Sequence, residues 1–302
     1  MTAQEPLLAA RESASGAIYD LGYQGYDGPR LGRRAAVATL FWASLRAAFG
    51  LGRSGRAKIV PWGVTALLLI PAGVTVAIAS LSPQAPAAFD YDNFLWNLST
   101  LVAIFVAAQA PELVSSDQRH RVLSLYFSHA LERSDYALAK LGALAAAIFL
   151  MTFAPMLLLF LGRVLLAADV VEAFGDELGQ LPQVIGAPLI YAVPLAAFSL
   201  AIAAFTPRRA YATGAIIAVF LVGAAIGGIL GDATSGALAD LSQLANPFVP
   251  LDGTRDWLVG ASIVDSPVGR MDYPMWVFAA EALAVTVIAT IATLWRYRGL
   301  QA

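Results

Sequence analysis

The longest apolar stretch of the chain covers residues 136–168 and reads YALAKLGALAAAIFLMTFAPMLLLFLGRVLLAA. Between Lys140 and Arg163 it contains no charged side chain. A helix needs roughly 20 apolar residues to cross a bilayer, so this stretch predicts a transmembrane span. Similar stretches precede and follow it. The six predicted spans are residues 59–80, 94–114, 136–168, 183–205, 210–230 and 275–295.

The composition points the same way. Apolar residues make up 59% of the 302 positions and charged residues only 13%, whereas about a quarter of a soluble domain is charged. We therefore expect an all-α, polytopic membrane protein, with residues 1–302 forming a single transmembrane domain. The chain has no Cys and two His, which excludes disulfides and thiolate metal sites and argues against a histidine-rich metal centre. The net charge of −2 does not indicate a nucleic-acid partner.

Lys and Arg residues are concentrated on alternate connections between the predicted spans. Positive charge in short loops is retained on the cytoplasmic side. We therefore predict a multi-pass protein of the plasma membrane with both termini in the cytoplasm. The basic residues assigned to that side are Arg11, Arg30, Arg33, Arg34, Arg46, Arg53, Arg56, Lys58, Arg119, Arg121, Arg133, Lys140, Arg208, Arg209, Arg296 and Arg298.

The segment before the first span has two parts. Residues 1–34 are polar and rich in Gly and Tyr, which predicts a flexible cytoplasmic tail. Residues 35–50 predict an amphipathic helix with Leu40, Phe41 and Leu45 on one broad face. Nearby basic residues and a Trp suit a connecting helix that lies in the headgroup region of the lipid bilayer. A helix packed on the surface of the protein is the alternative interpretation.

The connection between the second and third spans predicts a further helix. Ser115 and Gln118 have the spacing of a capping box, so we expect a helix from Ser115 to about His129. Leu125 and Tyr126 would then share one face with Val122 and His129. Ser134 is expected to cap the following span. An ordinary surface helix would show the same periodicity.

Three parts of this connection carry a family resemblance: ELVSSDQR at 112–119, the apolar residues 123–127, and RSDY at 133–136 followed by Lys140. Together they resemble the signature connection of type-2 ABC exporter permeases. IYDLGY at 18–23 and YDGPRLGR at 26–33 resemble the actinobacterial branch of that family. The chain departs from the family at 121–122, where Gly-Thr is common, and at 129–130, where Thr-Pro is common.

The resemblance implies a permease subunit of an ATP-driven exporter that pairs with a second permease subunit, identical or related. It also implies that the connection is a coupling helix, which docks on a separate ABC ATPase subunit. This chain has no G-x-x-x-x-G-K-[ST] phosphate loop. We therefore expect no cofactor in this chain, with ATP and Mg bound by the partner. The implied ATPase-coupling residues are Asp117, Arg119, Arg121, Val122, Leu125, Tyr126, His129 and Arg133.

Residues 231–274 form a connection that is too long for a bare loop. We expect one helix capped by Ser235 and stopped by Asn246-Pro247, and a second that starts near Thr254. Because both are short and apolar, we interpret them as re-entrant or interfacial helices on the external side. The family resemblance implies external helices here too. A lid packed on the spans is the alternative.

Few ionisable residues lie within the predicted spans, where charges are costly and often functional, and two of them suggest a role. Glu281 lies roughly 9 Å into the sixth span at the helical rise. Arg163 lies near the outer end of the third span. We hypothesise that the two pair as an outer gate. In the alternative, Arg163 reaches the headgroups and Glu281 faces water.

Other classes of function fit the sequence less well. A hydrolase within the membrane needs a nucleophile with a base, or paired acids, at membrane depth, so we do not expect an enzyme. An ion-coupled secondary transporter usually shows ionisable relays and internal repeats. A structural or assembly membrane protein is left open. Apolar span surfaces with scattered Ser, Thr and Gly favour an amphiphilic or hydrophobic substrate.

Overall fold

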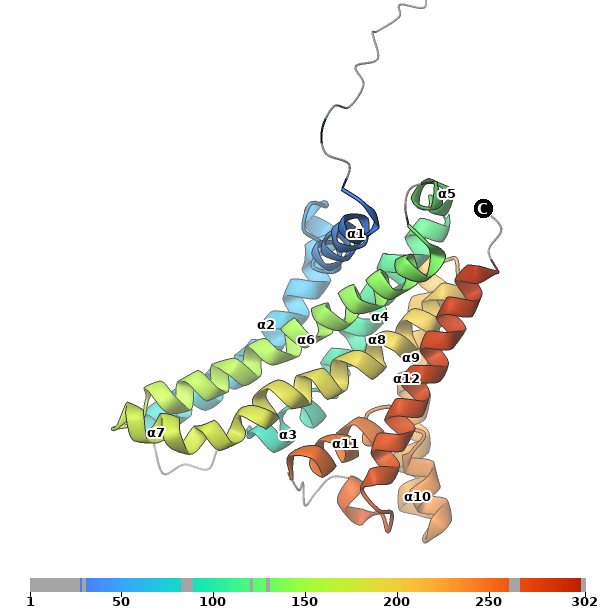
Figure 1. Ribbon diagram of the computed structural model, residues 1–302. Coiled ribbons are helices and arrows are strands. Elements are labelled where there is room, and N and C mark those ends of the chain that lie inside the picture. The colour runs from blue at the N-terminus through green and yellow to red at the C-terminus, as the bar shows by residue number, and fades with distance from the viewer. Residues whose placement is uncertain are drawn as a thin grey trace, which may run out of the picture. The chain divides into compact units, whose positions relative to one another are not determined.

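Six long helices dominate the computed structural model of the chain (Figure 1). They are α2 (Gly55–Leu81), α4 (Ser99–Arg119), α6 (Arg133–Leu165), α8 (Ala187–Phe205), α9 (Arg209–Ala233) and α12 (Trp276–Arg298). A turn of π-helix, η2 (Pro182–Gly186), runs directly into α8. All six are long and apolar enough to cross a bilayer. The described residues include no strand. The predicted all-helical architecture is therefore confirmed for the described residues, and the six helices support a multi-pass membrane protein.

The structure describes residues 28, 31–82, 89–119, 122–128, 131–260 and 267–299. The chain divides into two units, residues 1–31 and 32–302, and the helices of the described residues belong to the second. Most of the predicted tail, including its two family motifs, lies outside the described residues.

The second predicted span differs from the structure. Residues 94–97 belong to a separate short helix, α3 (Tyr91–Asn97), and Leu98 separates it from α4. The side chain of Asp90 caps α3, and the Asn93 side chain accepts a reciprocal bond from the backbone N–H of Asp90, which completes a capping box. This local cap starts a helix of its own before the apolar run, which hydropathy alone does not reveal. At its other end α4 continues to Arg119, five residues beyond the predicted boundary.

The shorter helices lie at two opposite ends of the bundle. The α5 end carries α1 (Arg33–Ala48) and α5 (Leu123–Phe127), and the α11 end carries α3 and the remaining short helices (Figure 1). Those remaining helices are α7 (Val170–Glu177), η1 (Leu178–Gln180), α10 (Ala237–Gln243), α11 (Val249–Val259) and η3 (Pro267–Arg270). The connection 231–274 thus contains the two expected helices. However, α10 has Gly236 rather than Ser235 before its first turn, and α11 begins at Val249, well before Thr254.

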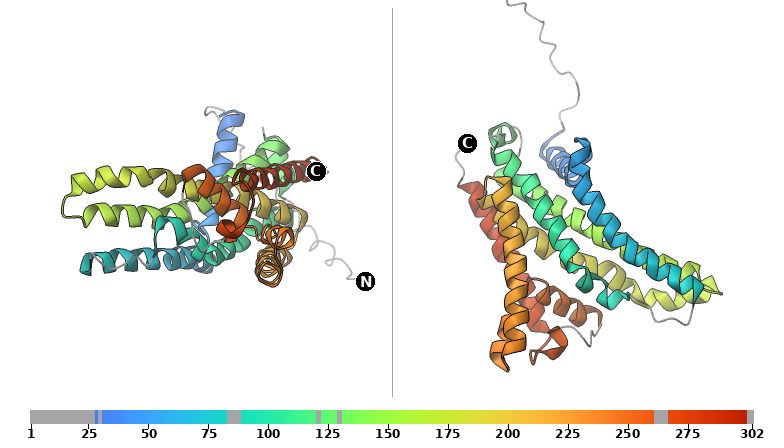
Figure 2. Two further views of the ribbon diagram at one scale, coloured as in Figure 1. Left: turned by 90° about the horizontal axis from the view of Figure 1, so that it is seen from below. Right: turned by 180° about the vertical axis from the view of Figure 1, so that it is seen from behind.

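The long helices form a centre and a periphery. In the most apolar stretch of each helix, the share of residues that are buried is 61% for α4, 50% for α6 and 56% for η2–α8. For α2, α9 and α12 this share is only 22% each. The views in Figure 2 show α2 along one side of the bundle and α9 near the opposite side. The exposed faces of the peripheral helices carry large apolar side chains such as Ile70, Leu221 and Ile288. Lipid or a protein partner, rather than water, is the suitable surrounding for such surfaces.

The apolar face predicted for residues 35–50 packs inward. Leu40, Leu45 and Ala48 of α1 are buried, and Phe41 lies against the central core. Helix α1 contacts α6 along this face, while Trp42 on another side is 60% exposed. The predicted stripe therefore holds α1 on the protein, and its position at the headgroups stays a prediction.

Two glycines allow α10 and α11 to sit tightly on the bundle. A Cβ atom at Gly223 of α9 would collide with the backbone carbonyl of Ala245, and one at Gly253 of α11 would collide with the ring of Phe278. The connection after α10 therefore lies directly on α9, and α11 lies directly on α12. These contacts shape the pocket described below.

Candidate functional site

Helix α5 links the two central helices α4 and α6, but it does not begin at Ser115. Ser115 is buried inside α4, and its hydroxyl donates a 2.9 Å hydrogen bond to the carbonyl of Thr206 beyond α8. The capping-box prediction is therefore wrong, because this hydroxyl serves another helix end. The five residues of α5 start at Leu123, and no side chain caps them.

The two sides of α5 have different surroundings. The ring of Tyr126 lies 5.6 Å from that of Tyr136 on α6, and the ring of Phe127 lies 6.1 Å from it. Tyr136 in turn contacts Tyr297 of α12 at 5.1 Å. Leu125, by contrast, is 65% exposed. Leu125 and Tyr126 were predicted to share a face, but the structure directs only Leu125 outward.

The polar residues of the predicted coupling region fasten α5 to the bundle. Asp117 accepts a 2.8 Å hydrogen bond from the Tyr136 hydroxyl and pairs with Lys140 at 2.9 Å. Arg133 donates a 2.7 Å bond to the carbonyl of Arg298, and its guanidinium lies 5.6 Å from the ring of Phe127. These contacts join α4, α6 and α12 directly beneath α5.

The other predicted coupling residues are less connected. Arg119 is exposed at the last position of α4, and Val122 is half-buried before α5. Arg121 and His129 lie outside the described residues. The predicted cap of α6 is also different. Glu132, not Ser134, forms the cap, together with Asp135.

Further ion pairs at the α5 end were not predicted from the sequence. Glu112 of α4 is buried and binds both Arg53, in the turn before α2, and Arg209 at the start of α9. The guanidinium of Arg33 similarly joins the start of α1 to the start of α6 through Glu132 and Asp135. The sequence does show that Glu112 is an acid at the basic end of an apolar span, which could have indicated an ion pair. Its partners, however, could not be predicted because they depend on the tertiary fold.

The proposed gate between Arg163 and Glu281 is not formed in this structure. Arg163 binds Asp90 at 2.7 Å, lies 3.7 Å from Glu177 and stacks over the ring of Tyr91 at 4.3 Å. Helices α6 and α12 meet near the α5 end through Tyr136 and Tyr297, then diverge toward the α11 end (Figure 1). Carboxylates from α3 and α7 are therefore nearer to Arg163.

A buried charged cluster connects α11 to the bundle. The side chain of Arg255 is fully buried between Asp252 and Asp256, at 2.8 Å and 2.7 Å. The Tyr191 hydroxyl of α8 donates a 2.7 Å bond to Asp252. Burial raises the pKa of Asp252 from 3.8 to about 6, against the opposing effect of Arg255. The sequence analysis expected a short external helix starting near Thr254, but it did not predict this cluster.

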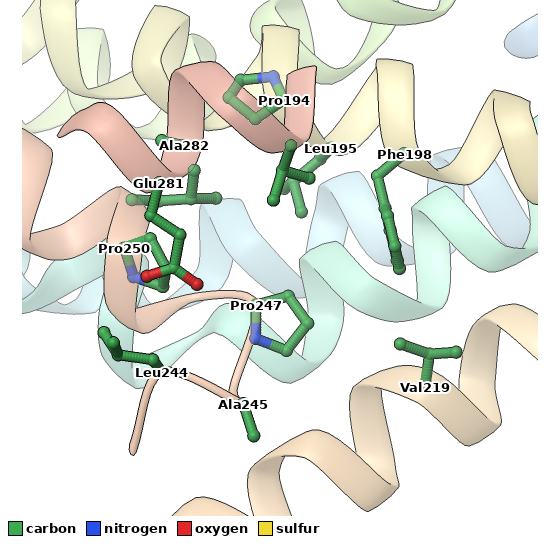
Figure 3. A pocket seen from close by; sticks show the side chains of 12 residues that line it. Pro194, Leu195, Phe198, Val219, Leu244, Ala245, Pro247, Pro250, Glu281 and Ala282 are labelled. Carbon is green, nitrogen blue, oxygen red and sulfur yellow. The ribbon is translucent and has the colours of Figure 1, made fainter. Parts of the chain in front are cut away.

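Glu281 lies instead in the wall of a pocket (Figure 3). The Glu281 pocket, as we call it, has a volume of about 200 Å³ and lies between α8, α9, α12 and the connection from α10 to α11. Its walls include Leu195, Phe198, Val219, Pro247, Pro250 and Val285. The Oε2 atom of Glu281 is buried and has no hydrogen-bond partner among the described residues.

Comparison with protein-family models and with curated protein sequences finds no match to this chain. Within the described residues, no group of three or more His, Asp or Glu side chains is arranged to hold a metal ion. The functional argument consequently depends on the two ends of the bundle: the packed and bridged α5 end, and the pocket with its neighbouring charges at the α11 end.

Proposed function

We propose that this chain is the membrane-spanning permease subunit of an ATP-driven exporter of the type-2 ABC class. Two copies, or one copy and a related subunit, would assemble with two separate ATPase subunits in the plasma membrane. The cargo would be an amphiphilic or hydrophobic molecule. The six candidate spans support a transport role, and the exposed apolar faces of α2, α9 and α12 leave room for lipid and for a second permease subunit.

The observation that carries the proposal is the two-sided arrangement of α5. Leu125 is exposed for contact with a partner, while Tyr126 and Phe127 rest on Tyr136. The Tyr136 hydroxyl bonds Asp117 of α4, so the same contact reaches both central helices. A partner that pushes on Leu125 would therefore displace α4 and α6 together. This is the mechanical property that a coupling helix requires.

The α5 contact can be tested by co-expressing the chain with a candidate ABC ATPase subunit from the same genome. Leu125→Asp should reduce co-purification of the ATPase at least tenfold, because a carboxylate would be placed where an apolar groove is expected. The matched control is Leu165→Asp at the other end of α6, where the leucine is 64% exposed compared with 65% for Leu125.

The control should insert and bind the ATPase normally. Unchanged binding and unchanged ATP hydrolysis in Leu125→Asp would contradict the coupling role. Failure of the wild-type chain to bind any ATPase would favour the structural or assembly role instead.

A further inference from the structure

The lining of the Glu281 pocket is apolar except for one side chain. Of the residues that line it, Glu281 alone is ionisable, and the others are Pro, Leu, Phe, Val and Ala. Figure 3 shows the Glu281 side chain extending from α12 toward the connection that carries Leu244 and Pro247. The carboxylate therefore borders the pocket and does not turn back toward its own helix.

No cation of the described protein compensates this carboxylate. Glu281 forms no ion pair within the described ranges, and its buried Oε2 atom accepts no hydrogen bond. Arg255 on the adjoining helix α11 is already held by Asp252 and Asp256. A buried acceptor without a partner destabilises the folded state, and more so when it is charged. A ligand that supplies both positive charge and an N–H donor would remove that destabilisation.

The pocket size limits the occupant. An engineered apolar cavity of about 150 Å³ holds one benzene molecule, so 200 Å³ accommodates one ring or a short branched alkyl group together with an amine. Whole drug-sized ligands usually occupy about 300–1,000 Å³. The pocket would thus hold the cationic end of a larger amphiphile, or a small organic ammonium ion in full.

We propose that the Glu281 pocket binds organic ammonium cations, with the N–H donating to Glu281 and the apolar substituents contacting Leu195, Phe198 and Val219. This inference deepens the proposed function, because it names amphiphilic amines as the substrate class of the exporter. The apolar walls select for hydrophobic substituents, and the single carboxylate selects for positive charge over neutral or anionic molecules.

The test measures binding of N,N-dimethylbenzylammonium to the full chain in nanodiscs by equilibrium dialysis, with empty nanodiscs as the blank. Isobutylbenzene is its neutral isostere, with a C–H in place of the N–H. The cation should bind the wild type at least tenfold more tightly than isobutylbenzene does. Glu281→Gln should abolish that preference while leaving isobutylbenzene binding within twofold. Val219→Trp, which fills the pocket from α9, should weaken both ligands.

Equal binding of the cation to the wild type and to Glu281→Gln would overturn the proposal, as would a wild-type affinity no greater than that for the isostere. The result is independent of the α5 experiment. If cation binding does not depend on Glu281 but the chain still binds the ATPase through Leu125, only the proposed substrate class is refuted. Cation binding that depends on Glu281, in a chain that binds no ATPase, would refute the exporter but keep the pocket assignment.

Discussion

Asp252 and Arg255 show how single charged residues are accommodated inside the α11 end. Both side chains are fully buried, and removing one member of such a pair leaves the other without compensation. Asp252 also accepts the Tyr191 hydroxyl, which anchors α11 to α8. Despite these partners, burial keeps the pKa of Asp252 at about 6, above its ordinary value of 3.8. The ionised form is therefore disfavoured in the folded state.

This pKa shift predicts a pH dependence of stability. Between about pH 4 and pH 6 the folded state retains the Asp252 proton longer than the unfolded state does, so the free energy of unfolding falls as pH rises. A shift of this size contributes on the order of 1–3 kcal/mol. Thermal unfolding in detergent at pH 4.5 and pH 7 should show a smaller pH effect in Asp252→Asn than in the wild type.

Exposed Asp232, changed to Asn, is the control for this measurement and should leave the pH effect unchanged. If Asp252→Asn and the wild type show the same pH effect, the buried carboxylate is not its source.

Residue partners were the least predictable feature of the site. Arg163 and Glu281 were both selected from the sequence because they interrupt apolar spans, and both proved to have distinctive surroundings. The predicted ion pair between them is not formed, because Asp90 and Glu177 contact Arg163 instead. Their segments, near α3 and in α7, have positions that local sequence patterns do not predict. The partners of Glu112 were hidden for the same reason. Hydropathy identifies costly charges, but only the tertiary fold identifies what compensates them.

At the scale of the elements, α5 depends on packing for its existence. A helix of five residues has too few hydrogen bonds to be stable alone. The rings of Tyr126 and Phe127 on Tyr136 provide its main anchorage. The element proposed to receive force from the ATPase thus rests largely on Tyr136, with Arg133 over the ring of Phe127 as a further contact.

Tyr136→Ala should detach α5, because it removes the ring on which the helix rests. Hydrogen exchange of the amides in residues 123–128 should become at least tenfold faster. Tyr136→Phe is the matched control: it keeps the ring and loses only the bond to Asp117, so exchange in that segment should stay within about threefold of the wild type. Full protection of α5 in Tyr136→Ala would show that other contacts hold it.

The long helices were predictable from sequence, whereas caps and short helices were not. Apolar runs of membrane length specify α2, α6, α8, α9 and α12 to within a few residues. Helix caps depend on which of several neighbouring polar side chains binds the free backbone N–H groups at the start of the helix. At the start of α6 this is Glu132 and not Ser134. Helix α11 starts at Val249 with Pro250 in its first turn, a position that suits proline but that carries no apolar periodicity.

For the whole molecule, the two ends of the bundle differ in charge. Ion pairs at the α5 end bring Arg33, Arg53 and Arg209 onto acidic partners. At the α11 end, α3, α7 and α11 contribute acids in excess, among them Asp90 and Asp256. Because basic residues in short loops are retained on the cytoplasmic side, we predict that the α5 end faces the cytoplasm.

The orientation can be tested with single cysteines, since the chain has none of its own. Ser235, in the exposed turn before α10, and Ser124, exposed on α5, lie at opposite ends of the bundle. A maleimide that cannot cross membranes should label Ser235→Cys in intact cells and should label Ser124→Cys only after permeabilisation. Labelling of Ser124→Cys alone in intact cells would invert the topology and separate α5 from any cytoplasmic ATPase. Labelling of both would mean that the bundle does not span the membrane with these ends on opposite sides.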